Sequence, residues 1–110
     1  MTLQTAPQAD RLSGVRIVPA SIGAYYPPIV AGADLLQVDF DARAVRHDAV
    51  YLVESTRDDW RGCRRFQVKP EGVHIDDSGA GDWRNIGTLD AVGLRVAGEV
   101  LEVFKPSLGG

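Results

Sequence analysis

Short runs of alternating apolar and polar residues, separated by turn-forming residues, recur along most of the chain. The runs cover residues 14–18, 34–40, 49–54, 63–69, 72–75 and 92–104, and residues 83–89 are ambiguous. Alternation with a period of two is typical of strands with one buried face, and Pro, Gly and Asp between the runs are typical of turns. We therefore predict a mainly β fold of about six or seven strands with little helix.

Several details refine this prediction. The pair Leu35-Leu36 predicts a strand buried on both faces. Gly98 interrupts the long last run and predicts a bend or bulge there. Residues 21–32 contain Pro and Gly and are predicted to be a loop, whereas the charged connector 41–48 has room for one turn of helix. Residues 70–71 fit a tight turn.

The length of 110 residues predicts a single domain, with residues 1–13 as a polar, flexible arm and residues 14–110 as the folded part. A net charge of -3 argues against direct binding of nucleic acid. No apolar run approaches the roughly 20 residues of a membrane span. The single Cys63 excludes an intrachain disulfide and a multi-cysteine metal site, which favours a cytoplasmic protein.

The order of the segments is more specific than any one of them. A first strand leads to Val-Pro-Ala-Ser-Ile and a Pro-rich loop, and then come Asp-Leu-Leu-Gln-Val-Asp, Val-Tyr-Leu-Val, Cys-Arg-Arg-Phe, a Gly-Val-His-Ile strand with an acidic loop, and Val-Ala-Gly-Glu-Val. Over residues 15–104 this order resembles the C-terminal domain of LexA-like and phage CI-like repressors, whose fold is shared with signal peptidases. The resemblance implies a serine peptidase homologue.

In that family a serine is the nucleophile and a lysine on a later strand is the base. One alignment places Ser21 at the nucleophile position, and another, anchored on Pro27 and Ile29, places Ala24 there. Both alignments place Arg64 at the base position. A guanidinium remains protonated and cannot act as a base, and Lys69, five residues further on and directly before Pro70, would have to reach back across the sheet.

The resemblance also implies a cleavable Ala-Gly or Cys-Gly bond ahead of the domain, and the residues before the first strand contain neither dipeptide. We therefore expect a pseudoenzyme that acts in self-association or protein binding, in phage or stress-related transcription regulation. The partner would be a second copy or a regulatory protein. The run 92–104 is longer than a typical strand, and we predict that its free edge forms the contact of a homodimer.

Two other functions remain open from the sequence. One is an active serine autoprotease or peptidase that uses Ser21, against which stands the ordinary role of a loop serine as a local cap. The other is an unrelated small β module that binds a partner.

Other residue types suggest alternatives that we weigh against simpler roles. His47 and His74 lie near carboxylates, which would suit a His-Asp catalytic pair or a two-His metal site, but His74 alternates with apolar neighbours and is predicted to face solvent. Residues 79–81 are too short for a phosphate loop. Tyr25 and Tyr26 suit either an interface patch or the core. We assign no metal and no cofactor.

Overall fold

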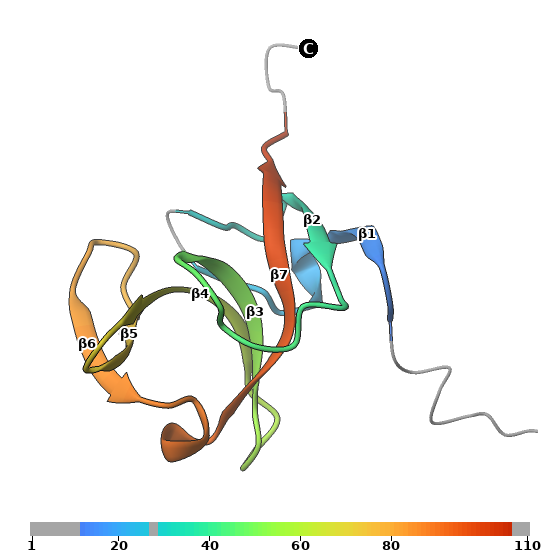
Figure 1. Cartoon of the computed structure of the whole chain (residues 1–110). Helices are drawn as coiled ribbons and strands as arrows, with labels where there is room; N and C mark the ends of the chain where they lie inside the picture. Colours follow the sequence, from blue (N-terminus) through green and yellow to red (C-terminus); the bar gives the residue numbers. More distant parts are fainter. Residues whose placement is uncertain (1–11, 27–28, 107–110) are drawn as a thin grey trace, which may run out of the picture.

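The fold is a single open antiparallel sheet of seven strands (Figure 1). The computed structural model describes residues 12–26 and 29–106, so most of the predicted arm 1–13 lies outside it, as do Pro27 and Pro28. The elements are β1 (Val15–Pro19), η1 (Ala20–Ile22), β2 (Leu35–Asp39), β3 (Ala49–Ser55), β4 (Arg61–Lys69), β5 (Gly72–Asp76), β6 (Trp83–Gly87), η2 (Asp90–Val92) and β7 (Leu94–Phe104). The described residues contain no α-helix, only the two short 3-10 turns η1 and η2. The predicted mainly β fold is confirmed.

The last strand lies inside the sheet, because the order is β1-β2-β7-β3-β4-β5-β6. β3 pairs with β7 over residues 94–100, and β2 pairs with it over residues 99–104. Each part of β7 therefore already has a partner within the chain. The order makes β7 an inner strand and β1 and β6 the edge strands, but residues 101–104 pair only with β2, so the predicted homodimer contact through residues 92–104 stays a prediction.

Two irregularities allow β7 to pair with both neighbours. Val53 pairs with Val96 but Leu52 pairs with Gly98, so β7 carries one extra residue there. A second register shift occurs between β2 and the far half of β7. At Gly98 an added Cβ would lie 2.6 Å from Val38 Cγ1, so a glycine is needed where the strands approach. The predicted bulge at Gly98 is confirmed.

Apolar side chains form two clusters, with Leu52 of β3 in one and its neighbours Tyr51 and Val53 in the other. Successive residues of a strand point to opposite faces, so both faces of β3 are buried. β2 differs: Leu36 is fully buried, whereas Leu35 is 45% exposed. The predicted burial of both leucines is wrong because nothing among the described residues covers the outer face of β2.

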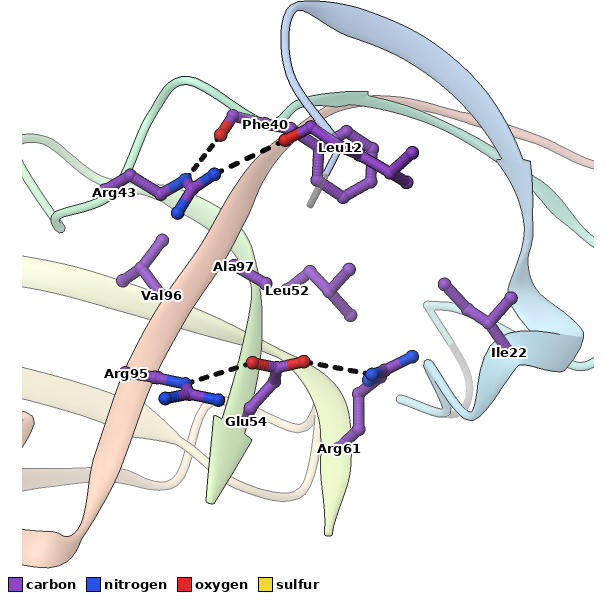
Figure 2. A pocket seen from close by; sticks show the side chains of 10 residues that line it. All are labelled: Leu12, Ile22, Phe40, Arg43, Leu52, Glu54, Arg61, Arg95, Val96 and Ala97. Atoms are coloured by element: carbon purple, nitrogen blue, oxygen red, sulfur yellow. Dashed lines mark hydrogen bonds and ion pairs between the residues drawn. The ribbon is translucent and has the colours of Figure 1, made fainter. Parts of the chain in front are cut away.

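The connector between β2 and β3 contains no helix. It folds around the hydroxyl of Tyr51, which donates a hydrogen bond to the carbonyl of His47 and accepts from the backbone N–H groups of Arg46 and His47. A pocket of about 560 Å³ opens where the connector and the end of β2 leave β7 (Figure 2).

Candidate functional site

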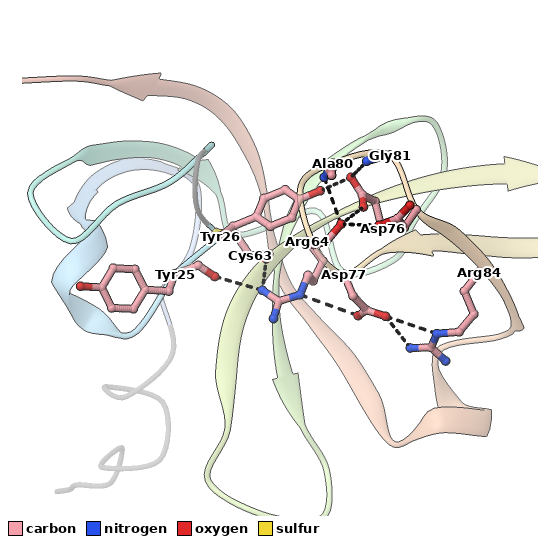
Figure 3. A network of polar contacts seen from close by, with 11 residues as sticks. Tyr25, Tyr26, Cys63, Arg64, Asp76, Asp77, Ala80, Gly81 and Arg84 are labelled. Atoms are coloured by element: carbon pink, nitrogen blue, oxygen red, sulfur yellow. Dashed lines mark hydrogen bonds and ion pairs between the residues drawn. The ribbon is translucent and has the colours of Figure 1, made fainter.

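Arg64, the residue at the predicted base position, holds the loop after η1 against β4 (Figure 3). Its Nη1 donates hydrogen bonds to the carbonyls of Tyr25, at 3.0 Å, and Cys63, at 2.6 Å. The guanidinium carbon lies 5.0 Å from the ring centroid of Trp60 and 5.6 Å from that of Tyr26, which are cation–π distances. The Arg64 side chain is only 19% exposed. The charged guanidinium therefore has a structural role, because it is packed against the carbonyls and rings that it contacts.

Tyr26 connects this loop to the turn between β5 and β6. Its hydroxyl donates a buried hydrogen bond of 2.9 Å to Asp76 Oδ2. Burial, together with the nearby Asp76 carboxylate, raises the pKa of Tyr26 to about 12. The phenol is therefore neutral and acts as a hydrogen-bond donor at ordinary pH.

Asp76 is the acceptor at the centre of the β5–β6 turn and is 3% exposed. It also accepts hydrogen bonds from the backbone N–H of Gly81, at 3.1 Å, and from Ser78 Oγ. Burial raises the pKa of Asp76, but the hydrogen bonds from Tyr26 and from backbone N–H groups outweigh it and hold the pKa below the ordinary 3.8. The buried carboxylate is therefore charged.

Asp77 adds a second link between β4 and the turn. Its Oδ2 accepts from Arg84 at 2.8 Å, and its Oδ1 lies 3.8 Å from Arg64 Nε, a buried atom that has no hydrogen-bond partner. We call the set the Arg64 network: Tyr25, Tyr26, Trp60, Arg64, Asp76, Asp77 and Arg84. The sequence analysis missed it, and the only signal was the acidic pair at positions 76 and 77 before a Gly-rich turn.

Ser21 and Arg64 are not brought into contact. Ser21 is exposed on η1 and forms no side-chain hydrogen bond with any described residue, and Lys69 is exposed at the far end of β4 beside Gly72. Ala24, the alternative residue for the nucleophile position, is fully buried. Ala24 directly precedes Tyr25, whose carbonyl accepts the hydrogen bond from Arg64. A methyl group, and no hydroxyl, therefore lies next to the Arg64 contact.

The two histidines contact different carboxylates. His47 Nε2 lies 2.9 Å from Glu99, and His74 Nε2 lies 3.6 Å from Glu71. The His74 side chain is only 14% exposed, so its predicted solvent-facing position is wrong. Its strand lies between β4 and β6 in the sheet. Among residues 12–26 and 29–106, no group of three or more His, Cys, Asp or Glu side chains is arranged to hold a metal ion.

The remaining candidates have ordinary structural roles. Cys63 is buried, and burial raises the pKa of its thiol to about 12, so it is not a nucleophile at neutral pH. Tyr25 is 59% exposed and Tyr26 is 1% exposed, so the adjacent tyrosines divide between surface and core.

No family model matches this chain, and no curated protein and no solved structure matches it either. In the part of the chain that the structure describes, no helix has the length and apolar character needed to cross a membrane.

Proposed function

We propose that this protein is a non-catalytic domain that acts by self-association, through the outer face of β1, β2 and β7. The supporting observation is a set of large apolar side chains that are between 42% and 54% exposed on these three adjacent strands: Val15, Ile17, Leu35, Leu101 and Phe104. We call this set the outer apolar face. Exposed apolar side chains that gather on one surface mark interaction sites.

The register places most of these side chains on the same side of the sheet. Leu35 pairs directly with Phe104, and Ile17 pairs with Gln37, two residues along β2 from Leu35. Directly paired residues, and residues two apart on a strand, project from the same face. The opposite face of β2 carries Leu36 and Val38, which are fully buried. The outer apolar face is therefore distinct from the core.

A second copy of the chain fits this surface. β1 pairs only with β2, so among the described strands its other edge is free to pair across a two-fold axis. This contact keeps the homodimer predicted from the sequence but moves it from the edge of β7 to a face to which Leu101 and Phe104 of β7 contribute.

A regulatory protein with basic residues is the second candidate partner for the same face. Asp39 and Glu102 project from it next to the apolar side chains, since they pair with Val15 and Gln37 respectively. In a homodimer these carboxylates would approach their own copies, whereas a basic partner would neutralise them. Self-association should consequently strengthen as salt screens the repulsion, and binding of a basic partner should weaken.

The absence of catalysis is supported by the Arg64 contacts. Arg64 is protonated and occupied by two backbone carbonyls and two aromatic rings. The resemblance to LexA-like and phage CI-like repressor domains, with a role in phage or stress regulation, is part of the proposal. In that interpretation Ala24 is the residue at the nucleophile position, because Arg64 contacts the adjacent Tyr25 and not Ser21.

Light scattering behind size exclusion tests the self-association. We expect a two-chain mass at tens of micromolar for the wild type, and a one-chain mass for Ile17→Lys and Phe104→Lys. Val68→Lys is the matched control, because Val68 is 46% exposed on β4, outside this face. A one-chain mass at low and high salt would remove self-association, and a dimer that survives Ile17→Lys would place the contact elsewhere.

Intact mass after incubation at alkaline pH tests the absence of catalysis. We expect no fragments from the wild type or from Arg64→Lys, since the Lys variant still lacks a hydroxyl at position 24. Defined fragments that disappear in Ser21→Ala would establish the peptidase alternative. Fragments from the double variant Ala24→Ser with Arg64→Lys alone would support both the resemblance and the second alignment.

A further inference from the structure

The pocket beside β3 and β7 combines an apolar centre with a charged rim (Figure 2). Leu52 of β3 and Ala97 of β7 lie at its centre, with Ile22 of η1 on one side and Phe40 and Leu12 on another. Its volume of about 560 Å³ is within the range of small-molecule sites. The pocket shares no residue with the outer apolar face.

Two arginines share one carboxylate on the lower rim. Glu54 accepts a hydrogen bond of 3.0 Å from Arg61 Nη2 and one of 3.1 Å from Arg95 Nε. We call these three residues the Glu54 cluster. Each guanidinium has five N–H donors, so both retain donors that Glu54 does not use. The Arg61 and Arg95 side chains are 43% and 67% exposed, which leaves these donors accessible to a ligand.

Arg43 contributes a third positive charge on the opposite rim. Its Nε and Nη2 donate to the carbonyls of Phe40 and Leu12, which hold the side chain in place but do not neutralise it. It forms no ion pair with any carboxylate among the described residues. The lining residues that the structure describes thus include three arginines and one glutamate, which makes a positive site in a chain of net charge -3.

We propose that this pocket binds an apolar chain that ends in a carboxylate. The apolar part would lie over Leu52 and Ala97, and the carboxylate would take the free donors of Arg43 or of the Glu54 cluster. Guanidinium groups match carboxylates in planar geometry and form charge-assisted hydrogen bonds with them. Two sources supply this chemistry, a free fatty acid and the C-terminus of a peptide with an apolar last residue.

Titration of the full-length ¹⁵N-labelled protein with decanoate, followed by amide chemical shifts, tests the proposal. We expect saturable shifts at Leu52 and Ala97, and none at Ile75, which belongs to the other apolar cluster. Decanol and decyltrimethylammonium are the controls for the charge of the end group, and both should bind more weakly. A capped tripeptide that ends in leucine, as free acid and as amide, distinguishes the two sources.

Variants test which side chains bind the ligand. Arg43→Gln and Arg95→Gln leave Glu54 paired with Arg61, and the variant that removes the arginine bound to the carboxylate should weaken decanoate binding by about tenfold, which corresponds to one charge-assisted hydrogen bond. Arg84→Gln is the matched control, because it removes an equal charge outside the pocket. Ala97→Leu should fill the centre and abolish binding, and its amide spectrum reports whether it is folded.

The outcomes separate clearly. A carboxylate site is supported if decanoate, the free-acid peptide or both bind. Which of the two binds identifies the source of the carboxylate. Absence of shifts at Leu52 and Ala97 with both probes overturns the proposal. The proposal is overturned if decanoate and decanol bind equally well. It is also overturned if neither Arg43→Gln nor Arg95→Gln weakens decanoate binding more than Arg84→Gln does, because the arginines then have no role.

Discussion

The Arg64 network and the Glu54 cluster use the same residue types with opposite results. In the Arg64 network Asp76 is 3% exposed and accepts hydrogen bonds from Tyr26, Ser78 and Gly81. In the Glu54 cluster the carboxylate is 24% exposed and serves two arginines that keep further donors free. The Asp76 carboxylate is buried and its hydrogen bonds are mostly satisfied, whereas the Glu54 cluster is open and carries excess donors.

The difference shows which quantities separate a structural ion cluster from a candidate binding site. A buried carboxylate with several donors stabilises the fold, because removing it leaves those donors without acceptors in a place that water does not reach. A rim carboxylate in water contributes little to stability. Its arginines can instead exchange water for a ligand. Mutations in the two sets should therefore affect different measurements.

The largest effect is expected for Asp76→Ala. The substitution leaves the Tyr26 hydroxyl and the Gly81 N–H without their acceptor, and we expect the free energy of unfolding in urea to fall by about 3 kcal/mol. Asp76→Asn, which keeps the shape, should cost less. A fall below about 1 kcal/mol would show that water replaces the carboxylate and that the turn is not a structural centre.

A double-mutant cycle with Tyr26→Phe isolates the 2.9 Å hydrogen bond from the rest of the network. We expect a coupling energy of about 1 kcal/mol or more, since the two groups are in direct contact in a buried site. Additive effects would mean that Asp76 acts through the turn backbone alone.

Arg64→Gln should have the next largest effect. It removes two hydrogen bonds to carbonyls and two cation–π contacts, and we expect a loss of about 2 kcal/mol in urea unfolding. Arg84→Gln is the control in the same network, because that side chain is 56% exposed and should contribute less than about 0.5 kcal/mol. Equal losses would contradict a special role for Arg64.

Acid should remove part of the Asp76 contribution. Its folded-state pKa is below the ordinary 3.8, so the folded protein binds fewer protons than the unfolded chain near that pH. The stabilisation is fully present above about pH 5 and is lost as the pH falls through the folded pKa. We expect the urea concentration at the midpoint of unfolding to decrease when the pH is lowered below about 4, and to decrease less in Asp76→Asn.

The stabilisation by Tyr26 is lost when the pH is raised, whereas that by Asp76 is lost when the pH is lowered. Its pKa rises from 10.0 to about 12, so its contribution is present below pH 10 and is lost as the pH rises towards 12. Urea midpoints of Tyr26→Phe should therefore depend less on pH in this range than those of the wild type. If the urea midpoints of the two proteins depend equally on pH, the loss of stability in alkali comes from other groups.

The sequence predicted the local strands well and the long-range arrangement poorly. Alternation located six of the seven strands, because it records which residues face a core. The insertion of β7 between β2 and β3 depends on bulges and on pairing across the whole chain, which no local pattern encodes. The exposure of Leu35 likewise depends on what covers the outer face of β2.

For the candidate site, the sequence pointed to Arg64 but not to its role. The Arg64 contacts come from a loop 39 residues away, and Tyr26 meets Asp76 across 50 residues. Neither pair has a spacing that helix or strand geometry would reveal. The Glu54 cluster was not predicted, since only strand pairing brings Arg95 beside Glu54.

The smallest effect on stability is expected for Glu54→Gln, and it sharpens the comparison most. The carboxylate is partly exposed and its two ion pairs lie on the rim, so the free energy of unfolding should change by about 0.5 kcal/mol or less. The same substitution removes the only negative charge among the described residues that line the pocket, and it frees donors of Arg61 and Arg95. Decanoate binding should therefore tighten while stability stays nearly constant. A loss of stability as large as that of Asp76→Ala would instead make the Glu54 cluster a second structural brace.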